Sequence, residues 1–371
     1  MDLEHLVPPA MSPDLEYIVT PGSKAVPIKI ALVNPTSYAT ANPHIQLIAV
    51  RHADLQAMIG TTLNYTQVPY YFYFIDLNTG QRLYAYYDYY INGYHIWFVK
   101  TAQIPGNSYY KIYMVYDPSQ TWLDGVYNGV NPVYASNVLG LSYGQYDNGS
   151  KVFYYYWNFA GTSLPSGWTQ YLNGGSISVN NGLTMTTSSS ASGSLGLVYN
   201  LPSTAPSIGL AARTWYNINQ CCGCSGGNDF VVQLGNSMSV PWSGNGYAGS
   251  IYGAGGGTMY IIKVSSGSTT VLTSTSESCG SATSIYRSFV WTYLNQSYLW
   301  HYESRVNILL SATDTTYTPS AIQQLLLGIM MPNSGTTSYT VNVLQVFDAP
   351  LSYSVTSGIE NFTPTPYIEP P

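Results

Sequence analysis

The feature that most constrains this chain is a two-residue alternation of apolar and polar side chains in short segments that end in turn residues. Val26, Ile28, Ile30 and Leu32 alternate with other residues, and the segment stops at Asn34-Pro35. Residues 82–90 and 94–100 alternate around Asn92-Gly93, a dipeptide typical of two-residue β-hairpins. Such segments predict antiparallel strands rather than helices.

The alternation continues through the second half of the chain. Ile177 and Val179 face Leu183 and Met185 across Asn180-Asn181-Gly182, which predicts another hairpin. Helical periodicity is almost absent, apart from one or two turns expected at residues 51–58. We therefore predict an all-β protein of two consecutive antiparallel β-sandwiches, jelly-roll-like in character, with extended arms at both ends.

The domain boundaries follow from shifts in composition. Residues 1–24 are rich in Pro and acidic residues, residues 25–142 form the first sandwich, residues 143–350 the second, and residues 351–371 a Pro-rich tail. The N-terminal segment also carries apolar side chains. These are Leu3, Leu6, Val7, Met11, Leu15, Tyr17 and Ile18. They favour an arm that docks on a partner subunit, although a disordered tail is the alternative.

Four stretches resemble a known architecture. Residues 145–169, QYDNGSKVFYYYWNFAGTSLPSGWT, precede GSISVNNGLTM, and upstream come VPIKIALVNPTSYATANPHIQLIAV and YHIWFVKTAQIPGNSYYKIYMVY. Together they resemble a two-domain arrangement of archaeal and some bacterial surface proteins, in which an uncharacterised β-rich domain precedes a concanavalin A-like lectin or glucanase domain. One Phe is inserted here between Trp97 and Val99. The resemblance implies a concanavalin A-like fold for residues 143–350, and no established activity for the first domain.

Charge limits the partners and the location. Charged residues are only 8% of the chain, the net charge is −6, and 37 tyrosines supply polar surface instead. No basic patch occurs, so we expect no nucleic-acid partner. The longest apolar run, residues 325–331, is far shorter than a membrane span needs, so we expect no membrane insertion. Met1 is followed by acidic residues rather than a signal peptide. This favours a virion surface over a secreted protein whose signal was removed, with an extracellular or cell-surface location as the alternative.

The carboxylates argue against hydrolysis. Glucanases of the concanavalin A-like fold carry a Glu-x-Asp-x-Glu strand that places an acid and a nucleophile on one face. The acids between residues 151 and 350 are Asp229, Glu277, Glu303, Asp314 and Asp348. None lies two or four residues from another, so we expect no enzyme activity.

Glycan binding is the site hypothesis. Aromatic faces stack on sugar rings, and amide side chains beside them bind hydroxyls. The loops 214–228 and 241–256 supply that mixture with Trp215, Tyr216, Asn217, Trp242, Asn245, Tyr247 and Tyr252. The alternative is that the two tryptophans cover the edge of the sandwich.

Three further sets of residues are candidates for a calcium site, for disulfides and for glycosylation. Asn228, Asp229 and Asp348 are the candidates for a calcium site, in a chain otherwise expected to need no cofactor. The cysteines are Cys221, Cys222, Cys224 and Cys279. An exterior location favours disulfides, with Cys221–Cys224 and Cys222–Cys279 preferred, over a metal site or free thiols. The glycosylation sequons begin at Asn64, Asn148, Asn295 and Asn361.

These observations predict a non-enzymatic exterior structural and adhesion protein. We expect a virion surface subunit, in a turret, spike or coat, that forms a homo-oligomer, docks on other virion or surface-layer subunits through its N-terminal arm, and presents a lectin-like domain to host surface glycans. The alternatives are a secreted or cell-surface glycan-binding protein, a glycoside hydrolase with a non-standard site, and a structural subunit that binds no glycan.

Overall fold

The protein was analysed as a computed structural model. The structure describes residues 25–187, 193–201, 209–220, 229–252, 258–276, 285–293, 297–303, 308–331, 337–348 and 352–357. Strands dominate this part of the chain, and nearly all pair antiparallel, which confirms the all-β prediction. The chain divides into two compact units. Unit 1 comprises residues 1–140, 145–152 and 351–368, and unit 2 comprises residues 141–144, 153–350 and 369–371.

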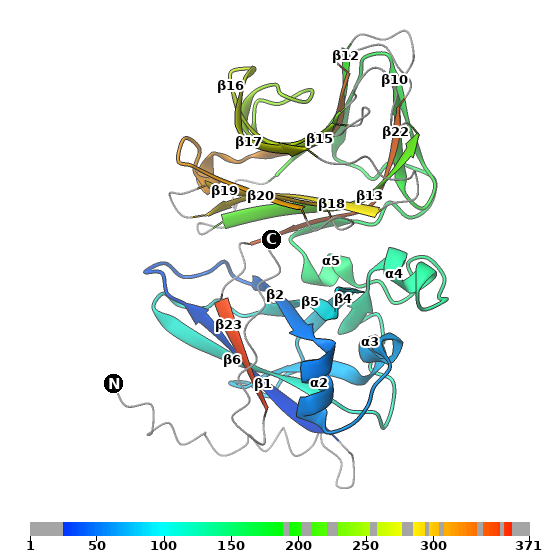
Figure 1. Cartoon of the computed structure of the whole chain (residues 1–371), viewed down its shortest axis with the longest axis vertical. Helices are drawn as coiled ribbons and strands as arrows, with labels where there is room; N and C mark the ends of the chain where they lie inside the picture. The colour runs from blue at the N-terminus through cyan, green and yellow to red at the C-terminus, as the bar shows by residue number, and fades with distance from the viewer. Residues whose placement is uncertain are drawn as a thin grey trace. The chain divides into compact units, whose positions relative to one another are not determined.

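Unit 1 contains two four-stranded sheets (Figure 1). The first has the order β23 (Ser352–Ser357), β1 (Val26–Asn34), β6 (Ser108–Tyr116), β3 (Phe72–Asp76). The second has the order β2 (His44–Arg51), β5 (Tyr94–Thr101), β4 (Tyr84–Ile91), β7 (Asn128–Val130). Every pairing is antiparallel except β4 with β7. In β1 every second side chain is buried, as the alternation predicted.

The hairpin between β4 and β5 forms where Asn92-Gly93 predicted it. Asn92 has φ +50° and Gly93 has φ +85°, the left-handed conformations that a two-residue turn requires. The burial of β4 does not alternate, since the five consecutive residues from Ala85 to Tyr89 are buried, and the register shifts between Tyr87 and Tyr89. Asp88 is fully buried at this irregularity.

Unit 1 also holds short helices that the strand pattern concealed. The expected turns at residues 51–58 are helix α2 (His52–Ile59). Ahead of β3 lie η2 (Tyr65–Gln67) and α3 (Val68–Tyr71), and Pro69 of α3 suits a first helical turn. Residues 117–141 include β7 and α4 (Pro132–Asn137), and the side chain of Asn131 caps the N-terminus of α4.

Two segments lie elsewhere than predicted. Residues 149–152, expected to start the second domain, form helix α5 (Gly149–Val152) within unit 1. The predicted C-terminal tail begins with strand β23, which pairs with β1 from Ile28 to Val33. The serine- and valine-containing sequence of β23 can extend an open sheet edge, which the Pro-rich composition further along the tail obscured.

Unit 2 is a β-sandwich of two large sheets stacked face to face (Figure 1). The eight-stranded sheet has the order β10 (Gly175–Val179), β11 (Leu183–Thr187), β22 (Ser338–Phe347), β13 (Gly209–Gln220), β18 (Ile285–Tyr293), β19 (Ser297–Glu303), β20 (Ile308–Asp314), with β8 (Tyr155–Trp157) also paired to β22. The seven-stranded sheet has the order β17 (Ser268–Ser276), β16 (Thr258–Ser265), β15 (Asn245–Tyr252), β14 (Asp229–Asn236), β21 (Gln324–Met331), β12 (Gly193–Asn200), β9 (Trp168–Leu172).

The main core of unit 2 lies between these sheets and includes Phe230, Tyr216, Leu325 and Tyr339. A short helix, η3 (Pro319–Ala321), precedes β21. Across the described part of both units, no helix combines the length and the apolar character that a membrane crossing needs.

Candidate functional site

The seven-stranded sheet is apolar on both of its faces. Phe230 and Val232 of β14 point into the core between the sheets, whereas Val231 belongs to a second cluster on the opposite, outer face. That outer cluster consists of Val198, Val231, Met238, Ala248, Ile262, Val264 and Leu326, with Tyr171, Trp242, Tyr260 and Met330 packed against it. An outer sheet face normally carries polar side chains, so this apolar face needs something to cover it.

Part of the cover is the β14–β15 loop, residues 237–244, which folds back over its own sheet. The side chain of Gln233, fully buried in β14, accepts a hydrogen bond from the Trp242 backbone N–H at 3.0 Å. Its Nε2 donates to the Ser243 carbonyl at 2.9 Å. One buried amide thus fixes both ends of a dipeptide above the sheet.

Two glycines make room for this loop. A Cβ atom at Gly196 of β12 would lie 2.5 Å from the Ser239 carbonyl oxygen, and one at Gly328 of β21 would lie 2.5 Å from Pro241 Cγ. Gly196 and Gly328 are direct neighbours across the two strands. The loop therefore contacts the sheet backbone itself, which a side chain at either position would prevent.

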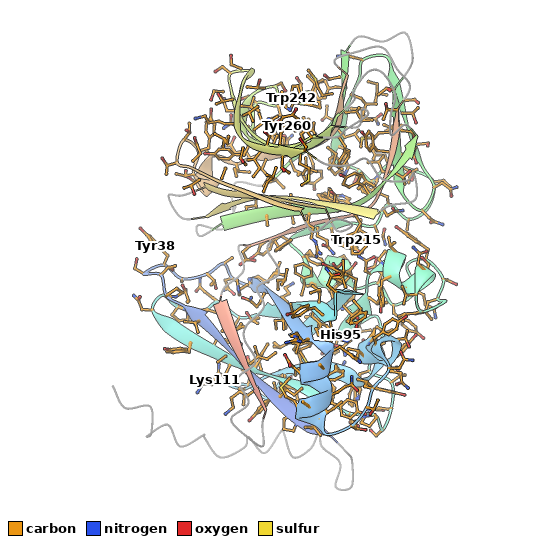
Figure 2. All side chains as sticks on the ribbon, in the orientation of Figure 1. Tyr38, His95, Lys111, Trp215, Trp242 and Tyr260 are labelled. Carbon is orange, nitrogen blue, oxygen red and sulfur yellow. The ribbon has the colours of Figure 1, made fainter. Side chains whose placement is uncertain are left out.

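Trp242 is held in a backbone conformation that is rare for a large residue. Its φ is +62°, in the left-handed region, where a bulky side chain costs energy that its surroundings must compensate. The ring is half-buried against the outer cluster, and its Nε1–H is buried without a hydrogen-bond partner among the described residues. Figure 2 shows Trp242 and Tyr260 on the concave side of the curved seven-stranded sheet. Backbone strain and a buried polar atom without a partner are both features that cluster at functional positions.

The predicted aromatic set does not assemble. Tyr216 and Tyr247 point into the core between the sheets, so the prediction that they bind a ligand is wrong. Trp215 lies on the other face of β13 from Tyr216, in the eight-stranded sheet, and Figure 2 places it on the opposite side of unit 2 from Trp242. Of the predicted residues with described side chains, Trp242 and Asn245 share the β14–β15 connection.

Asn245 has a structural role in that connection. Its Oδ1 accepts from the Ser266 backbone N–H at 2.9 Å, and its Nδ2 donates to Asn236 Oδ1 at 3.1 Å. The side chains of Asn217 and Tyr252 lie outside the described residues, although both positions are in strands. The residues missed were Tyr171 and Tyr260. Alternation from Tyr260 through Ile262 to Val264 could have revealed the second.

An ion pair closes one edge of unit 2. Asp314, at the end of β20, accepts hydrogen bonds from Tyr247 Oη at 2.7 Å and from Lys263 Nζ at 2.9 Å. Burial acts to raise the pKa of Asp314, but hydrogen bonds from Thr316, Tyr247 and Lys263 outweigh it and hold the pKa well below its ordinary value. Asp314 is therefore a firmly ionised structural group, unlike a general acid.

The calcium candidates are not brought together by the described structure. Asn228 and the Asp229 side chain lie outside the described residues. Asp348 is fully buried, and its charge acts on Tyr154, whose pKa is raised by burial and then by Asp348. Among the described side chains, no group of three or more His, Cys, Asp or Glu residues could hold a metal ion. All four cysteines, and the disulfides predicted for them, lie outside the described residues.

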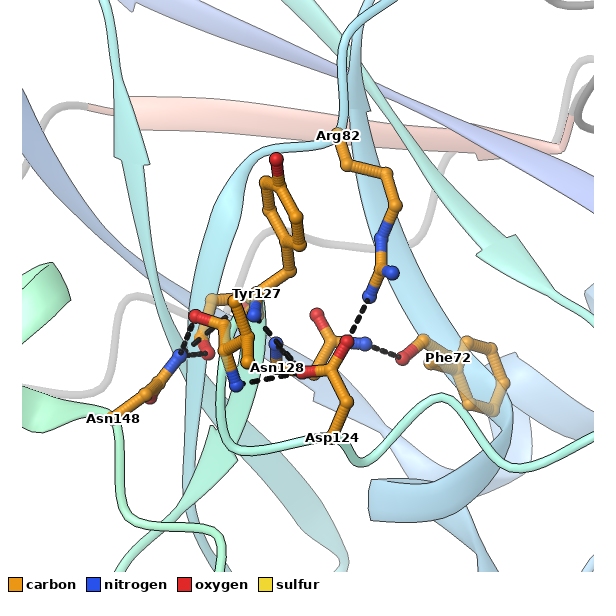
Figure 3. Close-up of polar contacts among 8 residues, drawn as sticks. Phe72, Arg82, Asp124, Tyr127, Asn128 and Asn148 are labelled. Atoms are coloured by element: carbon orange, nitrogen blue, oxygen red, sulfur yellow. Dashed lines mark hydrogen bonds and ion pairs between the residues drawn. The ribbon is translucent and has the colours of Figure 1, made fainter.

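The sequon at Asn148 proves unsuitable for a glycan. Asn148 is buried in unit 1, and its Nδ2 donates to the carbonyls of Ala85, Val126 and Tyr127 at 3.1–3.3 Å (Figure 3). The acceptor nitrogen is thus used for structure, and the glycosylation prediction at this position is wrong. Asn64 is exposed and caps η2 through its side chain, while Asn295 and Asn361 lie outside the described residues.

Asp124 organises the segment to which Asn148 binds. Its carboxylate accepts from the backbone N–H groups of Val126, Tyr127 and Asn128 at 2.8–3.0 Å and pairs with Arg82 at 3.2 Å (Figure 3). Arg82 also lies over the Tyr127 ring, at 4.8 Å from its centroid. These contacts are sufficient to explain the conformation of residues 124–130, so no bound ligand is needed to account for it.

Comparison with family models of proteins finds no match, and comparison with curated proteins finds none either. Among solved structures, the GH43 BlXynB protein from Bacillus licheniformis has 11% identity and a TM-score of 0.38, covering 52% of this chain and 39% of its own. The Emp47p carbohydrate recognition domain has 10% identity and a TM-score of 0.38, covering 52% of this chain and 93% of its own. The CBM2 module of the evolved Dit of Lactobacillus casei BL23 phage J-1 has 9% identity and a TM-score of 0.38, covering 53% and 96%.

This chain thus matches well under half of the length of the BlXynB protein. Likenesses with TM-scores below 0.5 say nothing about what this chain binds.

Proposed function

We propose that this chain is a non-enzymatic exterior protein whose second unit binds neutral parts of glycans on the outer face of its seven-stranded sheet, at Trp242 and Tyr260. The observation that carries this proposal is the conformation of Trp242. Its backbone strain is balanced by Gln233, and the result is an indole fixed on an apolar sheet face with its N–H unpaired.

The chemistry of the site suits a sugar. The C–H faces of a pyranose ring are apolar and stack on indole or phenol rings, while the ring hydroxyls accept hydrogen bonds from donors at the rim. Trp242 offers an aromatic face, and Tyr260 adds a second ring against the same outer cluster. Rigid aromatic side chains lose little conformational entropy on binding, which favours them as contacts for weakly apolar ligands.

The described carboxylates of unit 2 support binding rather than hydrolysis. Asp314 is committed to Lys263 and Tyr247, and Asp348 lies beside Tyr154 in a buried position. A glycosidase needs two carboxyl groups that flank one bond, one of them with a raised pKa. Asp314 has a lowered one. The alternative, a glycoside hydrolase with a non-standard site, would require acids outside the described residues.

Location and partners extend the proposal. The low charge and abundant tyrosine suit an exterior surface, and we place the protein on a virion, or else on a cell surface or outside the cell. Residues 1–24, which lie outside the described residues, would dock on other subunits, and the chain would form a homo-oligomer. Glycans on the host surface would be the ligands of unit 2.

A glycan array probed with the whole protein tests the function, followed by titration of the best ligand. Trp242→Ala and Tyr260→Ala should each weaken binding about fivefold or more, since loss of one aromatic contact costs roughly 1 kcal/mol or more. Tyr38→Ala is the matched control, because Tyr38 is a 52% exposed tyrosine of unit 1 and should bind as the unchanged protein does.

Thermal unfolding must show that the variants remain folded. If the protein binds no glycan, or if both site variants bind as tightly as Tyr38→Ala, the proposal is wrong.

A further inference from the structure

Unit 1 contains two histidines in direct contact. His52 is the first residue of α2, and His95 lies in β5 on the strand that follows the Asn92-Gly93 turn. His52 Nδ1 lies 2.8 Å from His95 Nε2, a hydrogen-bond distance. His95 is fully buried, whereas His52 is half-buried. The other ring nitrogen of His95, Nδ1, lies 2.8 Å from Tyr87 Oη, so both of its nitrogens are in use.

The hydrogen bond between the two rings depends on how many protons the two imidazoles carry. A hydrogen bond between two ring nitrogens needs one proton between them, supplied by either ring. The pair keeps this bond when both imidazoles are neutral, and when one of them carries an extra proton. When both are protonated, two N–H groups face each other at 2.8 Å and two like charges adjoin. The hydrogen bond between the two rings is therefore lost when the pair binds a second extra proton.

The groups around the pair do not compensate for that charge. Burial lowers the pKa of His95 well below its ordinary value, and the charge of His52 lowers it further. The groups facing the pair from β4 are Tyr87 and Tyr90, whose rings contact His95. Asp88 acts on Tyr87, and its Oδ1 accepts a hydrogen bond from Asn131 Nδ2 at 2.8 Å. From α4, Tyr134 contacts Tyr87.

The segment that His52 opens has few polar attachments at its start. The N-terminus of α2 has no side-chain cap, and His52 N–H donates to the Gly93 carbonyl at 2.7 Å. Leu55, Met58 and Ile59 bury the apolar side of the helix. Beyond it, the ring of Tyr65 stacks on Tyr90, with centroids 4.9 Å apart, and Tyr90 in turn contacts both histidines.

We propose that the His52–His95 pair is an acid-operated latch on residues 52–67, which we call the α2–η2 segment. The latch is closed while the pair holds at most one extra proton, and it opens when both imidazoles are protonated. Opening separates Tyr65 from Tyr90 and admits water to the buried His95 and Tyr87. An exterior protein that enters an acidic compartment or medium would meet this condition.

Hydrogen–deuterium exchange of the full chain tests the latch, at about pH 7.5 and about pH 4.5, with rates corrected for the intrinsic effect of pH. Protection of residues 52–67 should fall in acid by about tenfold per pH unit for each proton that opening binds. Protection of β6, in the other sheet of unit 1, should stay unchanged.

His52→Gln separates the latch from a general acid effect. A glutamine side chain can donate to a neutral His95 or accept from a protonated one, so the α2–η2 segment should stay protected at about pH 4.5. His44→Gln is the matched control, since His44 is also fully buried in unit 1 but hydrogen-bonds Gln46 at 3.0 Å, and it should open like the unchanged protein. If His52→Gln does not fold at neutral pH, His95→Gln serves the same purpose.

Three results would overturn the latch. These are unchanged protection of residues 52–67 in acid, simultaneous loss of protection in β6, and opening of the glutamine variant at the same pH as the unchanged protein.

Discussion

Replacement of Asp314 by Ala should destabilise unit 2 more than a typical surface substitution. The carboxylate accepts from Tyr247 Oη at 2.7 Å, from Lys263 Nζ at 2.9 Å and from the Thr316 backbone N–H at 2.9 Å. Breaking a buried ion pair by removing one partner costs about 3–5 kcal/mol. The side chains of Lys263 and Asp314 retain 22% and 14% exposure, so solvent screens the pair and the lower end applies.

We therefore expect a loss of about 3 kcal/mol in the free energy of unfolding, which lowers the melting temperature by roughly 6–12 °C in a unit of this size. Asp314→Asn should lose less, about 1–2 kcal/mol, because the amide oxygen still accepts from Tyr247. Lys263→Met removes the cation and keeps the aliphatic stem. The double variant Asp314→Asn with Lys263→Met should cost less than the sum of the single changes, because the two groups act together.

The pH dependence gives a second test of the same residue. The pKa of Asp314 is lower in the folded than in the unfolded protein, so the unfolded chain binds the proton first as the pH falls. The stabilisation is complete above the ordinary carboxyl pKa of 3.8 and is lost as the pH falls below it toward the folded value. Urea unfolding should show a constant difference between the unchanged protein and Asp314→Asn from about pH 7 to about pH 5, then a shrinking one. A difference below about 0.5 kcal/mol at neutral pH would refute the assigned role.

Two further changes probe the loop and the unit 1 network. Gly328→Ala should destabilise unit 2 by about 1–3 kcal/mol in urea unfolding and weaken glycan binding, because its Cβ would displace Pro241 and with it Trp242; intact binding would show that the loop position does not matter. Asn148→Ala should destabilise unit 1 by about 1–3 kcal/mol, because the carbonyl of Ala85 loses its donor in a buried contact and those of Val126 and Tyr127 lose theirs in half-buried ones. A glycan found on Asn148 by mass spectrometry would contradict the buried placement.

Local turn chemistry was predictable, because it depends on residues that adjoin in sequence. Asn92-Gly93 and Asn181-Gly182 both adopt positive φ, as the hairpins required. The short helices α3 and α4 were harder to predict, because their tyrosine and valine residues also favour strands. Their start signals, Pro69 and Asn131, are single residues that act only once the surrounding chain is folded.

Long-range pairing could not be read from the sequence. Strand β23 pairs with β1, more than three hundred positions earlier, so no local sequence signal identifies its partner. The same holds for residues 149–152, which belong to unit 1 although aromatic strands follow at once. Composition cannot say on which side of a domain boundary a single helical turn packs.

The candidate site shows why composition alone selected the wrong aromatic residues. Tyr247 and Ala248 are neighbours on one strand, yet the first lies in the core and the second in the outer cluster, because strand side chains alternate between faces. Alternation groups Tyr260 with Ile262 and Val264 on the outer face, although no single strand reveals which face is outer. Strand alternation cannot predict the direction of the Trp242 side chain, because Trp242 lies in a loop and has a left-handed backbone conformation. Its position depends on the hydrogen bond to Gln233 and on the absence of side chains at Gly328 of β21 and Gly196 of β12. A search for ligand-binding aromatics in such a sandwich should therefore begin with glycines paired across neighbouring strands, because they mark where a loop can lie against the sheet.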